Sequence, residues 1–271
     1  MEDLIICVAP VAGENQSEKF QGEMDVVREV IRSYDSGASI AHLHVRDGRG
    51  IQTADPTCFT GQVRGIHSAC RIIIEGSTGG TPEHSLEQRC VAITVPGIEM
   101  GSLNMGSVNM AGGVYQNPFS DIRYYSEQLM RKGIKPSLCI FDLSMINNAG
   151  IFLDMGFLEQ PLIYNFVLDV PEALPYSRDV IEFFTGRIKE DSVWFLTRHH
   201  AKGALGFMDA LELGGHVRVG YEDGPFLSNG DRAKSNAKLV DEIVRAAQEV
   251  GRKVVDPDRA REILGIPGLK G

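Results

Sequence analysis

Short aliphatic runs alternate along the chain with longer segments in which apolar residues recur at helical spacing. Such runs are typical of parallel strands that are covered on both faces. They predict strands at 4–9, 39–45, 71–77, 97–105, 137–141, 162–168, 192–196 and 216–220. The intervening periodicity predicts helices, among them 59–68, 82–89, 180–188 and 204–213. Several of these helices are expected to end at a glycine, as at Gly37 and Gly133.

Eight strands that alternate with helices predict an α/β fold, specifically a single-domain (β/α)8 TIM barrel over residues 1–271. A short C-terminal helix follows the barrel, with Asp256 as its cap and Pro257 at its first position. A doubly wound open sheet is the alternative. That fold usually carries a glycine-rich dinucleotide turn after its first strand, and residues 9–14 do not provide one.

Composition and charge narrow the class of protein. The 271 residues are 43% apolar and 23% charged, which is typical of a soluble globular protein. A net charge of -9 offers no basic field to phosphate backbones, which argues against a nucleic-acid partner. The first residues lack a positive segment, and their apolar run is too short for a signal peptide or a membrane span, so we expect a cytoplasmic protein. Five cysteines without a C-x-x-C pair predict reduced thiols.

Two histidines alternate with aliphatic residues in the second predicted strand. His42 and His44 share one face of that strand, about 7 Å apart, where both imidazoles can reach one divalent metal. Hydrogen-bonded core histidines are the alternative. Barrel enzymes place their active sites where strands end. The polar residues at predicted strand ends are Glu14, His42, His44, Arg46, Ser77, Ser102, Asn104, Asp142, Asn165, Arg198, Arg218, Glu222 and Asp223.

A carboxylate just past the eighth strand could complete the metal site. Glu222 is the expected third ligand, and a solvated loop acid is the alternative. Arg218 has the same strand parity as Glu222, so it should point toward the barrel mouth and hold a carboxylate or pair with Asp223. Metal hydrolases of the amidohydrolase kind would carry further histidines after strands five and six, which this chain lacks. His199 and His200 receive no role.

These residues, with their neighbours, resemble the β-keto acid cleavage enzymes, whose founding activity is 3-keto-5-aminohexanoate cleavage. The resemblance rests on segments 37–47, 77–80, 99–107, 214–220, 222–223 and 233–236. It implies a zinc-dependent TIM barrel, an acyltransferase that converts a β-keto acid and acetyl-CoA to acetoacetate and a new CoA thioester. It also implies a homo-oligomer, with a tetramer expected.

The resemblance also implies roles for individual residues. His42, His44 and Glu222 match the zinc ligands, and Arg218 and Asp223 match a proton-transfer pair. Ser77 would donate a hydrogen bond to the reacting oxygen. The expected substrate-binding residues are Glu14, Ser77, Gly80, Ser102, Asn104 and Cys139. No phosphate cradle for CoA is evident in the sequence.

Two departures from the family pattern bear on the substrate. The loop after Gly80 is shorter than in the family, and Cys139 replaces a carboxylate that would meet the ammonium of 3-keto-5-aminohexanoate. We therefore expect a β-keto acid without a terminal amine, with a neutral or hydroxylated short chain as the first choice. A second carboxylate would fit if Arg46 or Arg198 faced the site.

Three alternatives stay open at this point. Iron competes with zinc, since two histidines and one carboxylate also suit a non-haem iron site. A metal-dependent aldolase or hydrolase could use the same barrel mouth. A non-enzymatic ligand-binding barrel with a structural metal would instead require four protein ligands.

Overall fold

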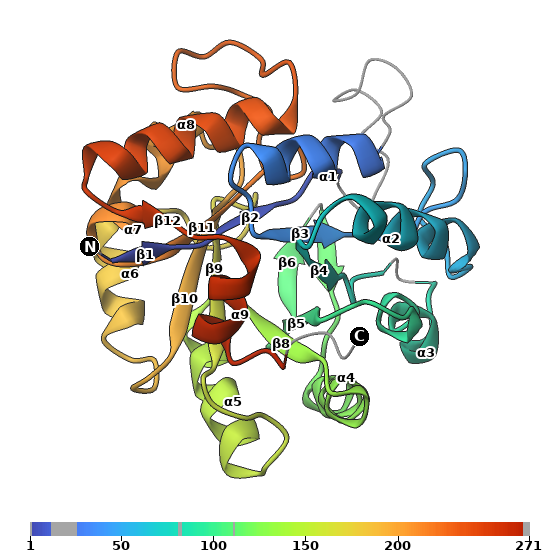
Figure 1. The fold of residues 1–271 in the computed structure, drawn as a ribbon. Helices are drawn as coiled ribbons and strands as arrows, with labels where there is room; N and C mark the ends of the chain where they lie inside the picture. The colour runs from blue at the N-terminus through green and yellow to red at the C-terminus, as the bar shows by residue number, and fades with distance from the viewer. Residues whose placement is uncertain (1, 12–25, 81–82, 111, 268–271) are drawn as a thin grey trace.

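Eight parallel strands close into a barrel in the computed structural model, which describes residues 2–11, 26–80, 83–110 and 112–267 (Figure 1). Their order around the barrel is β10-β11-β2-β3-β4-β5-β8-β9. The strands are β2 (Ile6–Val8), β3 (Ile40–Leu43), β4 (Ile73–Gly76), β5 (Met100–Asn104), β8 (Lys135–Ile140), β9 (Ile163–Leu168), β10 (Val193–Arg198) and β11 (His216–Val219). The predicted TIM barrel is confirmed, and the open sheet is wrong.

The first predicted strand is divided into two. β1 (Asp3–Leu4) pairs with β12 (Lys253–Val254), whereas β2 pairs with β3 and β11 inside the barrel. One aliphatic run therefore supplies both the strand that pairs with the C-terminal segment and the first strand of the barrel.

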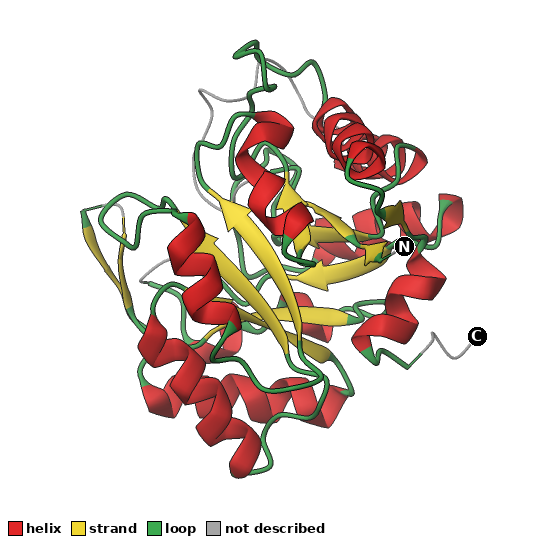
Figure 2. Cartoon of the chain, turned by 90° about the vertical axis from the view of Figure 1, so that its left-hand side faces the viewer, coloured by secondary structure: helices red, strands yellow, loops and turns green. Residues whose placement is uncertain are grey.

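Helices surround the barrel on its outer face (Figure 2). They are α1 (Val26–Asp35), α2 (Thr57–Ala69), α3 (Leu86–Arg89), α4 (Phe119–Lys132), α5 (Leu143–Asp154), α6 (Arg178–Thr185), α7 (Met208–Glu212), α8 (Asn236–Glu249) and α9 (Pro257–Leu264), with 3-10 turns η2 (Ala92–Thr94) and η3 (Gly203–Phe207). The helix predicted at 82–89 is shorter, because Ser85 forms a capping box with Gln88 and starts α3 at Leu86. Among the described residues, no helix is long and apolar enough to cross a membrane.

Apolar side chains form two cores, one between the strands and the helices and one inside the barrel. The inner core fills the amino-terminal end of the barrel with Ile5, Ile40, Ile73, Met100, Ile163 and Phe195. Residues of and around α9, including Ala260 and Leu264, pack against this inner core. α9 therefore seals the amino-terminal end, and the opposite end is left for polar side chains.

A β-hairpin that the sequence did not predict follows the carboxyl end of β5. It pairs β6 (Val108–Met110) with β7 (Gly113–Tyr115) in antiparallel register, with Val108 opposite Tyr115. Gly112, in the turn, has a φ of +75°, a conformation that glycine adopts without steric cost. The hairpin returns the chain to the barrel mouth before α4 begins.

Candidate active site

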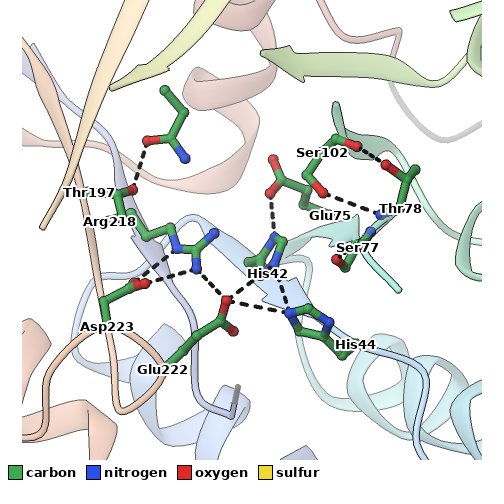
Figure 3. Close-up of polar contacts among 12 residues, drawn as sticks. His42, His44, Glu75, Ser77, Thr78, Ser102, Thr197, Arg218, Glu222 and Asp223 are labelled. Atoms are coloured by element: carbon green, nitrogen blue, oxygen red, sulfur yellow. Dashed lines mark hydrogen bonds and ion pairs between the residues drawn. The ribbon is translucent and has the colours of Figure 1, made fainter. Parts of the chain in front are cut away.

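His42 and His44 leave β3 with their rings directed toward the same point of the barrel mouth (Figure 3). Their Nε2 atoms lie 3.3 Å apart. Behind them, Glu75 stands opposite His42 in the β3–β4 register, and its Oε1 lies 2.5 Å from His42 Nδ1. Because a carboxylate only accepts hydrogen bonds, this contact assigns the proton to Nδ1 and leaves the Nε2 lone pair facing the mouth.

Glu222 reaches the two imidazoles from the turn that follows β11. Its Oε1 lies 3.4 Å from His44 Nε2 and 3.7 Å from His42 Nε2. The turn requires glycine at 220, because a Cβ there would lie 2.1 Å from the Ala9 carbonyl oxygen. The Glu222 amide donates to that same carbonyl, which ties the turn to the end of β2.

The three side-chain atoms fit a divalent metal. They form a triangle with sides of 3.3, 3.4 and 3.7 Å. Ligand atoms roughly 2.0–2.1 Å from a tetrahedral zinc ion lie about 3.3–3.4 Å from one another. Within the part of the chain that the structure describes, buried Glu222 Oε2 and His44 Nδ1 have no hydrogen-bond partner. The three predicted ligands are thus brought together from two strand ends that are far apart in sequence.

The electrostatics of the cluster favour the metal-binding protonation states. Burial lowers the pKa of His44, although the Glu222 carboxylate opposes this shift. Burial would raise the pKa of Glu222, but the Arg218 guanidinium and the two imidazoles outweigh it and hold that pKa well below the usual range. A neutral imidazole and an ionised carboxylate are the forms that bind metals.

Arg218 connects the metal cluster to Asp223. Its Nε and Nη2 donate to the two carboxylate oxygens of Asp223, each at 3.0 Å, and Nη2 also donates to Glu222 Oε1 at 2.5 Å. Burial would lower the pKa of Arg218, but the two carboxylates raise it well above its usual value. The Arg218–Asp223 pair that parity suggested is therefore present, and it lies directly beside the candidate metal ligands.

His199 is a site residue that sequence reasoning did not assign. It follows β10, and its Nε2 lies 3.9 Å from Asp223 Oδ1. Burial lowers the pKa of His199, so the neutral ring is favoured. The next residue, His200, contacts Asp223 only through its backbone amide, which donates to the Asp223 carbonyl. The only available signal was the position of His199 immediately after a strand.

Ser77 and Ser102, both predicted to contact substrate, lie on adjacent strand ends with different partners. Ser77 Oγ accepts a hydrogen bond from the Gly79 amide at 3.0 Å. Ser102 Oγ accepts from the Thr78 amide at 3.3 Å, and the Thr78 hydroxyl donates to the Ser102 carbonyl (Figure 3). Ser102 thus fastens β5 to the segment after β4.

Four further residues were predicted to contact the substrate, and three of them are described. Gly80 lies where a Cβ would come within 2.6 Å of Arg89 Cγ. Asn104 accepts a hydrogen bond through its carbonyl from the Asn117 side chain. Burial, followed by the Glu75 carboxylate, raises the pKa of the Cys139 thiol to about 12, so this side chain is neutral. Glu14 lies outside the described residues.

Two members of the predicted strand-end ring have structural partners instead. The Asp142 carboxylate accepts from the Met145 amide and caps α5. Arg198 donates twice to Asp169 Oδ2, at 2.9 and 2.7 Å, and lies over the Tyr176 ring. These contacts give Asp142 a role in capping its helix and leave Arg198 paired with Asp169.

The remaining ring members and one acid that was missed have partners of their own. Asn165 accepts from the Thr197 hydroxyl at 2.7 Å. Arg46 donates to the Gly50 carbonyl, and burial lowers its pKa although Glu222 opposes this. Glu75 was missed, yet its signal was present: an acid inside an isoleucine strand must find a buried partner.

Comparisons with known proteins agree with this geometry. The profile of the beta-keto acid cleavage enzyme family matches residues 4–266. The chain is 36% identical to the 3-keto-5-aminohexanoate cleavage enzyme of Fusobacterium nucleatum, over 98% of this chain and 99% of that one. It is 33% identical to the 3-oxoadipate:acetyl-CoA acetyltransferase of Cupriavidus necator, over 88% and 84%.

A solved structure supports the fold. The apo structure of ObcA superposes with a TM-score of 0.73 at 19% sequence identity. The match covers 90% of this chain and 64% of that longer chain. At this identity the likeness concerns the barrel architecture alone.

Proposed function

The chain belongs to the β-keto acid cleavage enzyme family, and from that premise we propose a zinc-dependent enzyme that converts a β-keto acid and acetyl-CoA to acetoacetate and a new acyl-CoA. Membership of an enzyme family removes the non-enzymatic binding barrel. The observation that carries the proposal is the triangle of His42, His44 and Glu222 beside the Arg218–Asp223 pair. The acetyl-CoA in the name of the Cupriavidus necator relative supports the choice of co-substrate.

The proposed exchange moves an acetyl group onto the β-keto acid and releases its acyl part. Two bonds break: the C2–C3 bond of the β-keto acid and the bond between the acetyl carbon and the CoA sulfur. C2 joins the acetyl carbonyl carbon, and the CoA sulfur takes the released acyl group. The products are acetoacetate and the new acyl-CoA, with no oxidant or reductant required.

The residues of the mouth supply the first proton transfer. Asp223 is the proposed base that removes a proton from C2, and the paired hydrogen bonds from Arg218 hold both of its oxygens in place. A bound zinc ion would supply positive charge that favours negative charge on the substrate's ketone oxygen. Ser77, whose oxygen already accepts from the Gly79 amide, would donate its one proton to a substrate oxygen.

The chain's own side chains favour a substrate without an amine. The neutral Cys139 thiol cannot pair with an ammonium group. Arg198 is engaged by Asp169, so a second substrate carboxylate would depend on Arg46, whose buried Nε has no partner among the described residues. A neutral or hydroxylated short chain remains the proposed substrate class.

A substrate panel tests this proposal. β-Keto acids are incubated with acetyl-CoA, and new CoA thioesters are identified by mass spectrometry. We expect kcat/KM for 3-ketohexanoate to exceed that for 3-keto-5-aminohexanoate, because an unpaired ammonium loses a charge-assisted bond worth about 1.5–3 kcal/mol. A preference for the amino compound would refute the role of Cys139. Turnover that needs no CoA would instead indicate the aldolase or hydrolase alternative.

Metal analysis tests the site itself. Purified protein is expected to hold one divalent metal per chain, and elemental analysis distinguishes zinc from iron. His42→Ala and His44→Ala should lose the metal, whereas His67→Ala, on α2, should keep it. Full occupancy in both site variants would show that the ligands are misassigned.

A further inference from the structure

The β6–β7 hairpin carries a tyrosine hydroxyl to the edge of the candidate site. A Cβ added to Gly79 would lie 3.9 Å from Tyr115 Oη, 3.0 Å from Ser77 Oγ and 3.9 Å from His44 Cε1. Three polar groups from three different elements therefore surround one small space. Glycine at 79 keeps that space open, and it lies immediately beside one of the candidate metal ligands.

The Tyr115 hydroxyl has a proton to offer. Its oxygen accepts a hydrogen bond from Arg89 Nη2. A phenolic hydroxyl has one hydrogen, and this contact does not use it. Burial raises the pKa of Tyr115, although Arg89 opposes this, so the proton is retained at neutral pH. No acceptor for it is found within the described ranges.

Arg89 holds the tyrosine in place and brings positive charge behind it. The buried guanidinium lies 4.8 Å from the centre of the Tyr115 ring and 4.9 Å from that of Tyr125. It also donates to the carbonyls of Thr78 and Gln116, at 3.4 and 3.3 Å. With its donors held by these fixed groups, Arg89 acts on the open space through the hydroxyl of Tyr115.

Ser77 presents the same situation on the other side of the space. Its oxygen accepts from the Gly79 amide, and its own proton has no acceptor in the described part of the chain. Two hydroxyl protons and a nearby guanidinium therefore face one position. The ligand chemistry that satisfies two converging donors and a positive charge is a carboxylate.

We propose that Tyr115 is a further substrate-binding residue that, together with Ser77, holds the carboxylate of the β-keto acid. This inference rests on the proposed function. A β-keto acid has one carbon between its ketone and its carboxylate, so a ketone at the metal requires the carboxylate to bind next to a metal ligand. The space at Gly79, which His44 borders, meets that requirement.

Binding measurements without acetyl-CoA test the inference. Isothermal titration calorimetry on the metal-loaded protein compares acetoacetate with acetoacetamide, which lacks the negative charge. Tyr115→Phe should weaken acetoacetate binding about 10- to 100-fold, and acetoacetamide binding less, about 2- to 10-fold. Tyr125→Phe is the matched control, because its hydroxyl is also buried beside Arg89 but has no hydrogen-bond partner among the described residues. It should bind both ligands as the unmodified protein does.

Three results would overturn the inference. If Tyr115→Phe binds acetoacetate as the unmodified protein does, Tyr115 does not donate a hydrogen bond to this ligand. If Tyr125→Phe loses as much affinity as Tyr115→Phe, the loss comes from altered packing around Arg89. Gly79→Ala fills the space with a methyl group and leaves Tyr115 intact, so it should weaken the binding of both acetoacetate and acetoacetamide. Normal binding by Gly79→Ala would show that the carboxylate binds elsewhere. Failure of the proposed function is distinguishable, because it is seen as absent acyl-CoA formation by the unmodified protein.

Discussion

The barrel contains a buried arginine–carboxylate pair at each end, and the two pairs have different surroundings. At the mouth, Arg218 holds Asp223 through two hydrogen bonds of 3.0 Å. At the sealed end, Arg261 of α9 holds Glu99 through two hydrogen bonds of 2.6 and 2.8 Å. All four side chains are buried. The chemistry of the contact is therefore the same, and the difference lies in the neighbouring groups.

The neighbours separate a structural pair from a reactive one. Arg261 also donates to the Arg71 carbonyl, and the inner apolar core lies against its helix. Arg218 instead donates to Glu222, whose second oxygen is buried without a hydrogen-bond partner among the described residues. Because Glu222 also lies against the two imidazoles of a possible metal site, the mouth is the end that can receive a metal ion.

The largest effect is expected when the proposed base at the mouth is removed. Asp223→Asn preserves the shape of the side chain but removes the base, so kcat/KM should fall about 10²- to 10⁴-fold. Metal content should be unchanged, because Asp223 is not among the three candidate ligands. Steady-state kinetics and elemental analysis on the same preparation check both points. An active Asp223→Asn protein would mean that another group is the base.

Breaking the pair at the sealed end should change stability and leave activity intact. Glu99→Gln leaves the Arg261 charge buried without its partner, which typically costs about 3–5 kcal/mol of unfolding free energy. Urea denaturation measures this loss, and kcat/KM should equal that of the unmodified protein. Arg259→Met, which breaks an exposed pair with Asp3, should have a much smaller effect on stability. A loss of activity without a loss of stability in Glu99→Gln would contradict the division between the two ends.

The contact behind His42 provides a smaller effect at the mouth. Glu75→Gln weakens the acceptor that orients the His42 ring, and such outer partners typically contribute about 10- to 100-fold in metal affinity. Competition with a chelator of known affinity measures the change. Glu99→Gln serves as the control, with unaltered metal affinity. Equal affinities in Glu75→Gln and the unmodified protein would show that His42 does not depend on this contact.

A buried histidine near the sealed end predicts a gradual loss of stability in acid. Burial, followed by the Arg252 charge, lowers the pKa of His216 to about 3, and its Nδ1 accepts from the Ile5 amide. In the unfolded chain the His216 ring is protonated below about pH 6.5, whereas in the folded protein it stays neutral down to a much lower pH. Its contribution to the unfolding free energy is therefore fully present above about pH 6.5. It should fall by about 1.4 kcal/mol per pH unit below it.

Denaturation midpoints between pH 7 and pH 5 check this slope. His216→Asn keeps an acceptor for the Ile5 amide but cannot titrate, so its stability should depend less on pH over the same range. An identical slope in the variant and the unmodified protein would assign the acid sensitivity to other groups.

The sequence by itself determined the barrel and the residues that could bind a metal. Continuous aliphatic runs at regular intervals predicted eight strands, because strands covered on both faces contain few polar residues. Alternation placed His42 and His44 on one face, and the eighth strand end supplied Glu222. The expected family, and with it an enzyme, follows from motifs that contain these same residues. These inferences depend only on local periodicity and on neighbours within a few positions.

Only the tertiary structure decided which polar residues face one another. Glu75 reaches His42 across a strand pair, and His199 reaches Asp223 from another strand end. Arg198 occupies an equivalent strand end but turns toward Asp169. Tyr115 arrives on a hairpin that no periodicity indicated. The physical reason is that a strand pattern fixes which face a side chain leaves from, whereas the direction of a long polar side chain is set by partners that only folding brings within hydrogen-bond distance.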